Sequence, residues 1–256
     1  MVIGKGMMAK AFAAYINKAD VTIFASGVSN SSEQNQEAFQ REERLLCDAI
    51  NNYSRTSVIV YFSTCSIYDR SVNKTPYVRH KLKMESIVSE NTKQFYIFRL
   101  PQVIGKTSSK TLIKVLFDKI QNEECFDLWI DSYRNLIDID DVVLTIGFII
   151  QNNLFKNEIT HIASPFNTPV LEIVKIIEMI LNKRANYAVV KKGANYAVEL
   201  GRCMEIYNRL GIRFSEDYIK KTIEKYYTNS FVNNRGATGC LGLTDIINAA
   251  LFAVKK

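Results

Sequence analysis

A hydroxyl, a phenol and an ammonium stand close together in the first half of the chain. Thr64 follows the apolar run at residues 57–63, and Tyr77 and Lys81 lie in a segment that begins at Pro76. If this segment is helical, Tyr77 and Lys81 share one face, because positions i and i+4 are neighbours on a helix. A free phenol has a pKa of about 10, so an adjacent ammonium would let Tyr77 exchange a proton near neutral pH. The same spacing also arises by chance in a chain with 13 tyrosines.

A glycine turn near the amino terminus has the form of a dinucleotide fingerprint. A short apolar strand at residues 1–3 runs into Gly4-Lys-Gly-Met-Met-Ala9 and then into an apolar-periodic helix through about Asn17. This is the pattern G-x-G-x-x-A. The first glycine would allow the turn, Gly6 would let a pyrophosphate approach the backbone, and Ala9 would keep the helix close to the strand. The turn alone is a modest signal, and the hydroxyl, tyrosine and lysine that follow it in order make it specific.

In this order the motifs resemble those of the extended short-chain dehydrogenase/reductase family, in particular its nucleotide-sugar epimerases, dehydratases and ketoreductases. Residues 20–27 are similar to the family's strand that ends beside the cofactor, and residues 63–68 to its Ser-Ser/Thr-x-x-Val-Tyr segment. Residues 99–105 look like the strand and loop that lead into its substrate region. Residues 134–142 resemble its Arg-Asp-Phe-Val-x-Val-Asp-Asp-Val segment. The resemblance runs to about Tyr227 and covers most of the chain.

The resemblance implies an NAD- or NADP-dependent epimerase or ketoreductase that acts on a nucleotide-linked sugar, in surface polysaccharide or deoxysugar biosynthesis. It implies Tyr77 as the general acid/base and Lys81 as the residue that lowers its pKa and holds the nicotinamide ribose. Thr64 would bind the sugar hydroxyl or ketone. The residues implied for the cofactor are Gly4, Lys5, Gly6, Met7, Met8, Ala25, Ser26, Gly27, Tyr77, Lys81 and Pro101. Those implied for the substrate are Thr64, Cys65, Ser66, Gln102 and Arg134.

The largest departure from the family pattern lies between the first helix and Asp20. The family's second strand, whose final acidic residue holds the adenosine ribose, and its third strand have no counterpart here. We therefore expect the first strand to form an edge of the sheet and the adenosine half of the cofactor site to be reduced. Asp20 begins its strand, so it cannot simply replace the missing ribose ligand. This departure leaves open an alternative function, a non-redox nucleotide-sugar-binding protein that acts as a partner or regulatory subunit.

Smaller departures concern the substrate side. Cys65 and Ser66 stand where the 4,6-dehydratases of the family carry an Asp-Glu pair, so dehydration lacks its proton-transfer groups and is disfavoured. We interpret Cys65 mainly as a small structural residue at the strand exit. For Arg134, phosphate binding and an ion pair with Asp138 or Asp140 are equally plausible.

Alternating apolar strands and helical patterns predict an α/β fold, with a Rossmann-like parallel sheet covered by helices on both faces. The expected division is a dinucleotide-binding domain at 1–140, a smaller substrate lobe at 141–227, partly interleaved with the sheet, and an appendage at 228–256. The expected strands are 21–25, 58–63, 95–100 and 126–130, and the expected helices are 33–51, 77–90, 111–122, 142–152 and 170–181.

Composition agrees with an enzyme of this kind. With 256 residues, 47% of them apolar, the chain can bury one large core or a core with a smaller lobe. The net charge of +7 comes from scattered basic residues without a nucleic-acid motif, so we expect no nucleic-acid partner. We expect no membrane segment or signal peptide, and hence a cytoplasmic protein. The spacing of the cysteines and histidines predicts no metal site. Assembly as a homodimer stays open.

Overall fold

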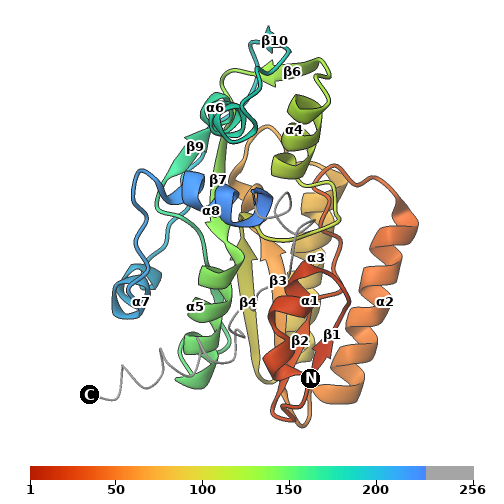
Figure 1. Cartoon of the computed structure of the whole chain (residues 1–256). Coiled ribbons are helices and arrows are strands. Elements are labelled where there is room, and N and C mark those ends of the chain that lie inside the picture. Colours follow the sequence, from red (N-terminus) through yellow and green to blue (C-terminus); the bar gives the residue numbers. More distant parts are fainter. Residues whose placement is uncertain (229–256) are drawn as a thin grey trace, which may run out of the picture.

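The computed structural model describes residues 1–228 and contains a central parallel sheet between two layers of helices (Figure 1). Its strands lie in the order β1-β2-β3-β4-β8, and each neighbouring pair is parallel. The predicted fold class is therefore confirmed. In this part of the chain β1 pairs only with β2, so it forms an edge, as expected. The strands are β1 (Val2–Ile3), β2 (Val21–Phe24), β3 (Val58–Thr64), β4 (Phe95–Leu100) and β8 (Ile159–His161).

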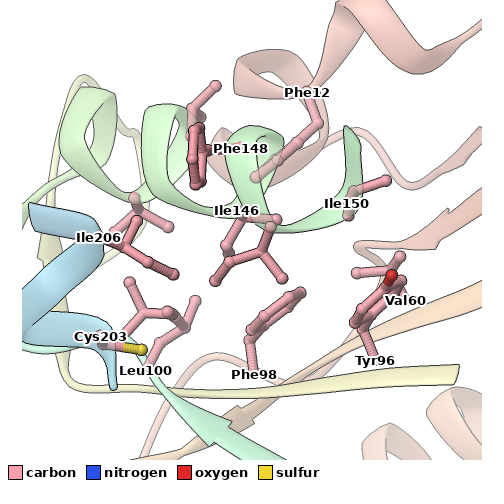
Figure 2. Packing of buried hydrophobic residues seen from close by; sticks show 14 of the residues in the cluster. Phe12, Val60, Tyr96, Phe98, Leu100, Ile146, Phe148, Ile150, Cys203 and Ile206 are labelled. Atoms are coloured by element: carbon pink, nitrogen blue, oxygen red, sulfur yellow. The ribbon is translucent and has the colours of Figure 1, made fainter. Parts of the chain in front are cut away.

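Side chains of the sheet alternate between two apolar cores because successive residues of a strand point to opposite faces. Ile59 and Tyr61 of β3 face one core, whereas Val60 faces the other. The first core is covered by α2 (Gln36–Tyr53) and α3 (Pro76–Asn91). The second is covered by α1 (Met7–Ala11), the short helix η1 (Ala13–Tyr15), α5 (Ile139–Gln151) and α7 (Cys203–Leu210). Figure 2 shows this second core, in which Phe98 and Tyr96 of β4 lie below α5.

A smaller part of the molecule lies beyond the carboxyl ends of the central strands (Figure 1). It contains the three-stranded sheet β5-β7-β9, the two-stranded sheet β10-β6 and a core of its own. The chain passes between the two parts several times, since α5, β8 and α7 return to the central sheet. The division at residue 140 stays a prediction. The elements are β5 (Gln102–Ile104), α4 (Leu112–Gln121), β6 (Phe126–Trp129), β7 (Tyr133–Asp138), β9 (Asn167–Pro169), α6 (Val170–Leu181), β10 (Tyr187–Val190) and α8 (Tyr218–Tyr227).

Helix α8 is fastened to the junction of β7 and α5 by hydrogen bonds and an ion pair. Asp138 accepts from the hydroxyl of Tyr226 and from Lys225 Nζ, each at 2.7 Å. Tyr218 donates to Asp141 Oδ2 at 2.6 Å and accepts from the backbone N–H of Asp138 at 2.9 Å. These contacts join residues 77 to 88 positions apart in the chain. Helix α8, the last described helix, is therefore held against the start of α5.

The first helix is shorter than predicted. Instead of continuing to about Asn17, it ends at Ala11 and is followed by the 3-10 turn η1. Phe12 and Tyr15 are both buried in the second core, and their spacing of three matches one 3-10 turn. Burial of these two rings therefore decides the local backbone. Within residues 1–228, no helix is both long and apolar enough to cross a membrane. The predicted appendage lies, apart from Thr228, outside the described residues.

Candidate active site

The predicted site residues gather at the carboxyl ends of the strands of the central sheet. The glycine turn follows β1, residues 25–27 follow β2, Thr64 ends β3, and Pro101 follows β4. In a parallel sheet the carboxyl ends of all strands lie on the same side, which is where ligands of open α/β folds bind. Tyr77 and Lys81 reach this edge from α3, whose start is fixed by Thr75 as the capping residue and Pro76 in the first turn.

The turn after β1 needs glycine at one position and leaves space at another. Gly4 has a φ of +140°, and a Cβ built there would lie 2.4 Å from the carbonyl oxygen of Ala25. A Cβ on Gly6 would meet nothing within 4 Å, so the backbone at the start of α1 is open to a ligand. Lys5 is exposed, whereas Met7 and Met8 pack against the second core. Met7 and Met8 therefore anchor the start of α1 to the second core.

Replacing Gly4 by alanine is expected to destabilise the protein by about 1 to 3 kcal/mol, because both the backbone conformation and the contact with Ala25 become strained. Gly6→Ala is the matched control and should change stability little, since its Cβ enters open space. Urea unfolding of both variants measures the difference. Equal stabilities would show that the turn does not depend on the conformation at Gly4.

The side chain of Tyr77 lies beside Thr64 at the end of β3. Both are buried, and the side chain of Tyr77 is only 6% exposed. Burial raises the pKa of Tyr77 to about 12, although the hydrogen bond with Thr64 lowers it, and the nearby Glu42 carboxylate raises it further. At neutral pH Tyr77 is therefore a protonated phenol. It is a proton donor placed beside a second hydroxyl.

The ammonium of Lys81 is fully engaged with protein acceptors. Its Nζ lies 3.0 Å from Glu42 Oε1, 3.1 Å from the hydroxyl of Tyr61 and 3.4 Å from the carbonyl oxygen of Phe62. An ammonium has three hydrogens, and each has an acceptor here. Burial raises the pKa of Tyr77 and the Glu42 carboxylate, which is paired with Lys81, raises it further. That Lys81 lowers the pKa of Tyr77 stays a prediction.

Glu42 is the central residue of this network and is fully buried. Its carboxylate accepts hydrogen bonds from the backbone N–H of Val28 at 2.6 Å and from the hydroxyl of Tyr61 at 2.7 Å. His80 Nε2 lies 3.1 Å away. Burial alone raises the pKa of Glu42. The Lys81 charge and the hydrogen-bonding groups together outweigh burial and lower the pKa to about 2. The carboxylate is therefore charged at every physiological pH.

Sequence reasoning did not single out Glu42. A signal was present, because Phe39, Glu42, Leu46 and Ala49 follow the spacing of one helical face. Three of these four residues are apolar and all are buried. A charged residue in the middle of an apolar stripe indicates a buried partner of opposite charge.

Gly27 makes room for the buried ion pair. A Cβ at this position would lie 2.8 Å from Lys81 Nζ and 2.9 Å from Glu42 Oε1. The neighbouring Ser26 is held from α2 by Arg41, which donates to its carbonyl oxygen at 3.2 Å. The residues after β2 therefore lie beside the Lys81–Glu42 pair, and their role in cofactor binding stays a prediction.

A second polar network lies beneath Thr64. Arg99 binds Glu85 with its Nη2 at 2.6 Å, and Ser63 also donates to Glu85. The hydroxyl of Tyr68 lies 3.0 Å from Arg99 Nη1 and 2.8 Å from His161 Nε2. These contacts fix the end of β3 relative to β4 and β8.

Cys65 is fully buried beside this network. Its thiol donates to the carbonyl oxygen of Arg99 at 3.4 Å. Burial raises the pKa of the thiol to about 12, so the thiolate that would react does not form near neutral pH. The structural interpretation of Cys65 fits this environment better than the predicted substrate contact.

The remaining substrate residues lie on the side of the smaller part. Ser66 accepts a hydrogen bond from Thr64 at 3.0 Å, and Gln102 is half-buried at the start of β5. Arg134 donates to the carbonyl oxygen of Tyr133 at 2.7 Å. Within residues 1–228 it forms no ion pair with Asp138 or Asp140, both of which bind Lys225 instead.

Tyr196 is a further residue of this region that sequence reasoning missed. Burial raises the pKa of Tyr196 to about 12, the nearby Asp69 carboxylate raises it further, and the Arg134 guanidinium opposes the shift. Tyr196 therefore lies within electrostatic range of Arg134, a predicted substrate residue. It belongs to an extended segment without regular structure, which gives no periodic pattern from which a site could be predicted.

Several solved structures share this fold, and each matches most of the chain. The PbgP3 protein from Burkholderia pseudomallei has a TM-score of 0.67 at 16% identity, with 84% of this chain and 78% of that chain covered. A UDP-glucuronic acid 4-epimerase mutant from Bacillus cereus, in complex with UDP-4-deoxy-4-fluoro-glucuronic acid and NAD, has a TM-score of 0.67 at 15% identity, covering 84% and 76%. RMD from Pseudomonas aeruginosa, complexed with NADPH, has a TM-score of 0.65 at 14% identity, covering 89% and 98%.

These likenesses show the fold. No curated protein matches the chain. The model of the NAD dependent epimerase/dehydratase family, however, matches residues 4–163. This span contains the glycine turn, Thr64, Tyr77 and Lys81, and it is more than half of the sequence. The chain belongs to the NAD dependent epimerase/dehydratase family.

Proposed function

We propose that the protein is an NAD- or NADP-dependent epimerase or ketoreductase that acts on a nucleotide-linked sugar, in surface polysaccharide or deoxysugar biosynthesis. The observation that carries the proposal is the Thr64–Tyr77 pair, a buried proton donor beside the open glycine turn. The ligands named with the Bacillus cereus and Pseudomonas aeruginosa structures, a UDP-sugar analogue with NAD and NADPH, support the substrate and cofactor classes. The proposal includes a cytoplasmic location.

The residues at the sheet edge fit a dinucleotide at two points. The backbone at Gly6 would hold the pyrophosphate, because no Cβ obstructs its approach. Lys81 would hold the nicotinamide ribose by exchanging its longest hydrogen bond, the 3.4 Å contact with the Phe62 carbonyl. The cofactor, when bound, accepts or supplies a hydride, and the protein supplies position and proton transfer.

Proton transfer is the part of the reaction that this chain's own residues perform. Tyr77 is protonated at neutral pH and can donate to the oxygen of a ketone, which Thr64 would orient by a second hydrogen bond. The opposite direction requires a phenolate, which burial and the Glu42 charge disfavour. Among the reactions of the family, ketoreduction therefore fits the site best. Cys65 and Ser66 offer no carboxylate for dehydration.

Calorimetric titration with NAD, NADP and nucleoside diphosphates tests the cofactor assignment. We expect both dinucleotides to bind with less than about tenfold difference in affinity, because no acidic residue is expected to repel the 2′-phosphate of NADP. A strong preference for NAD would mean that an acidic group binds the adenosine ribose after all.

The same titration distinguishes the alternative function. Binding of a nucleoside diphosphate without any dinucleotide would overturn the enzyme proposal in favour of a non-redox binding protein. The comparisons do not favour this alternative, since the matching family is described as NAD dependent.

A further inference from the structure

A pocket of about 610 Å³ lies at the amino ends of the central strands. Val21 and Val58, the first residues of β2 and β3, line it together with parts of η1 and α5. Strand β3 runs from Val58 at this pocket to Thr64 at the candidate active site, a span of seven residues or about 20 Å. The pocket is thus separate from the candidate active site and lies at the opposite ends of the strands.

Two buried phenols line the pocket. Tyr15 is 9% exposed and Tyr96 is 1% exposed, and neither hydroxyl has a hydrogen-bond partner within the described part of the chain. Figure 2 shows the ring of Tyr96 beside Phe98, with its oxygen directed toward α5. Tyr15 and Tyr96 come from η1 and β4 and both line this one pocket. Buried hydroxyls in proteins nearly always have a partner, and a ligand that carries an acceptor could bind both.

The walls of the pocket are apolar and leave space in front of Tyr15. Val143, Phe148 and Leu210 contribute apolar surface. Gly147 lies on α5 between Val143 and Phe148, and a Cβ there would be 3.6 Å from the Tyr15 hydroxyl. A glycine inside a helix costs stability relative to alanine. Here its lack of a side chain leaves the Tyr15 hydroxyl uncovered on the side of α5.

The rim of the pocket is positively charged. Lys18, Arg55, Lys93 and Lys156 line it, and Asp20 is the one acidic residue among the described lining residues. None of the four basic side chains forms an ion pair within residues 1–228. A concave surface lined by charges of one sign attracts a ligand of the opposite sign.

We propose that this pocket binds a small organic anion with a planar apolar body and a hydrogen-bond acceptor at its far end. The acceptor binds the hydroxyls of Tyr15 and Tyr96, the body packs against α5, and the anionic group lies at the basic rim. This site is independent of the proposed catalytic function, because it shares no residue with the candidate active site.

The probe for this site is 4-acetylbenzoate, which has a carboxylate at one end and a ketone at the other. We expect calorimetry to give a dissociation constant of about 1 mM, ordinary for a ligand of this size. Acetophenone lacks the charge and 4-ethylbenzoate lacks the acceptor, and both should bind about 5- to 10-fold more weakly. A crystal structure with 4-acetylbenzoate should show its ketone beside both phenols.

Single substitutions test whether 4-acetylbenzoate binds in this pocket. Tyr15→Phe and Tyr96→Phe remove hydroxyls that have no partner in the described protein, so the fold should not lose stability, whereas binding should weaken about 5- to 10-fold in each. Lys93→Gln, on the exposed rim, should weaken binding and reduce its dependence on salt. Tyr77→Phe changes the candidate active site and should leave binding of 4-acetylbenzoate unchanged.

Several results would overturn the proposal. They are the absence of binding at about ten times the expected dissociation constant, equal binding by the parent protein and both phenylalanine variants, and loss of binding in Tyr77→Phe alone. A crystal structure in which the two phenols bind only ordered water in the presence of the probe would also contradict it. In that case the hydroxyls would serve a hydrated structural cavity.

Discussion

Replacement of Tyr77 by phenylalanine is expected to lower turnover by roughly 10²-fold or more while changing stability by no more than about 1 kcal/mol. The ring keeps its place in the small core with Val28, Phe39 and Val78. Only the hydroxyl beside Thr64 is removed. Because this hydroxyl is the proton donor of the proposed reaction, the loss should appear in kcat rather than in substrate affinity.

Steady-state kinetics with a nucleotide-linked keto sugar and the reduced dinucleotide measure this effect. Tyr187→Phe, in β10 of the smaller part, is the matched control and should keep the turnover of the parent protein. Thermal unfolding of both variants separates a chemical loss from a folding defect. Equal turnover in Tyr77→Phe and the parent would remove Tyr77 from the mechanism.

Replacement of Glu42 by glutamine is expected to destabilise the protein by about 3 to 5 kcal/mol. The change leaves the Lys81 ammonium, which is buried, without its counter-charge. Glu43→Gln is the matched control, because its partner Lys83 is 58% exposed, and exposed pairs contribute at most about 1 kcal/mol. Urea unfolding at neutral pH measures both. Similar small losses in the two variants would mean that the buried pair contributes little.

The pH dependence of the free energy of unfolding tests whether the Glu42 carboxylate stabilises the folded protein. The pKa of Glu42 is about 2 in the folded protein and 4.5 ordinarily. A depressed folded pKa stabilises the protein above the ordinary pKa, and this stabilisation is lost as the pH falls from about 4.5 toward 2. The parent should therefore lose up to about 3 kcal/mol more than Glu42→Gln across this interval. Identical acid profiles would exclude Glu42 as the cause.

A double variant tests whether the cost comes from the unpaired lysine. Lys81→Met combined with Glu42→Gln removes both charges, so no isolated ammonium remains buried. It should recover part of the stability lost in Glu42→Gln alone, whereas independent effects would simply add. Additive losses would place the role of Glu42 in its bonds to Val28 and Tyr61 rather than in the ion pair.

The sequence was sufficient for the features that depend on local patterns. Strand β4 and helix α6 begin and end at the predicted residues, because each is a continuous apolar or amphipathic run with clear limits. The spacing of Tyr77 and Lys81 on α3 follows from helical geometry alone. The glycine turn, Thr64, Tyr77 and Lys81, which the sequence groups by their order, lie near the carboxyl ends of the central strands.

Features that depend on distant contacts could not be predicted in this way. The role of Lys81 is set by Glu42, 39 positions earlier in the chain, and no local pattern records that pairing. Strands β5, β8 and β9 have three residues each, which is too few for a visible alternation. The 3-10 turn after α1 is decided by burial of Phe12 and Tyr15 against the sheet, a tertiary effect that overrides helix propensity.

The fastening of α8 to Asp138 has a consequence for synthesis on the ribosome. The apolar surface of α6, including Ile173 and Ile177, shares a core with Ile223 of α8. While the emerging chain lacks α8, the part of this surface that α8 covers stays exposed and the Asp138 carboxylate lacks its bonds to Lys225 and Tyr226. The central strands β1 to β4 are made long before. The smaller part is therefore the last to become native, and it is the part of the nascent chain that most needs protection by a chaperone until α8 is complete.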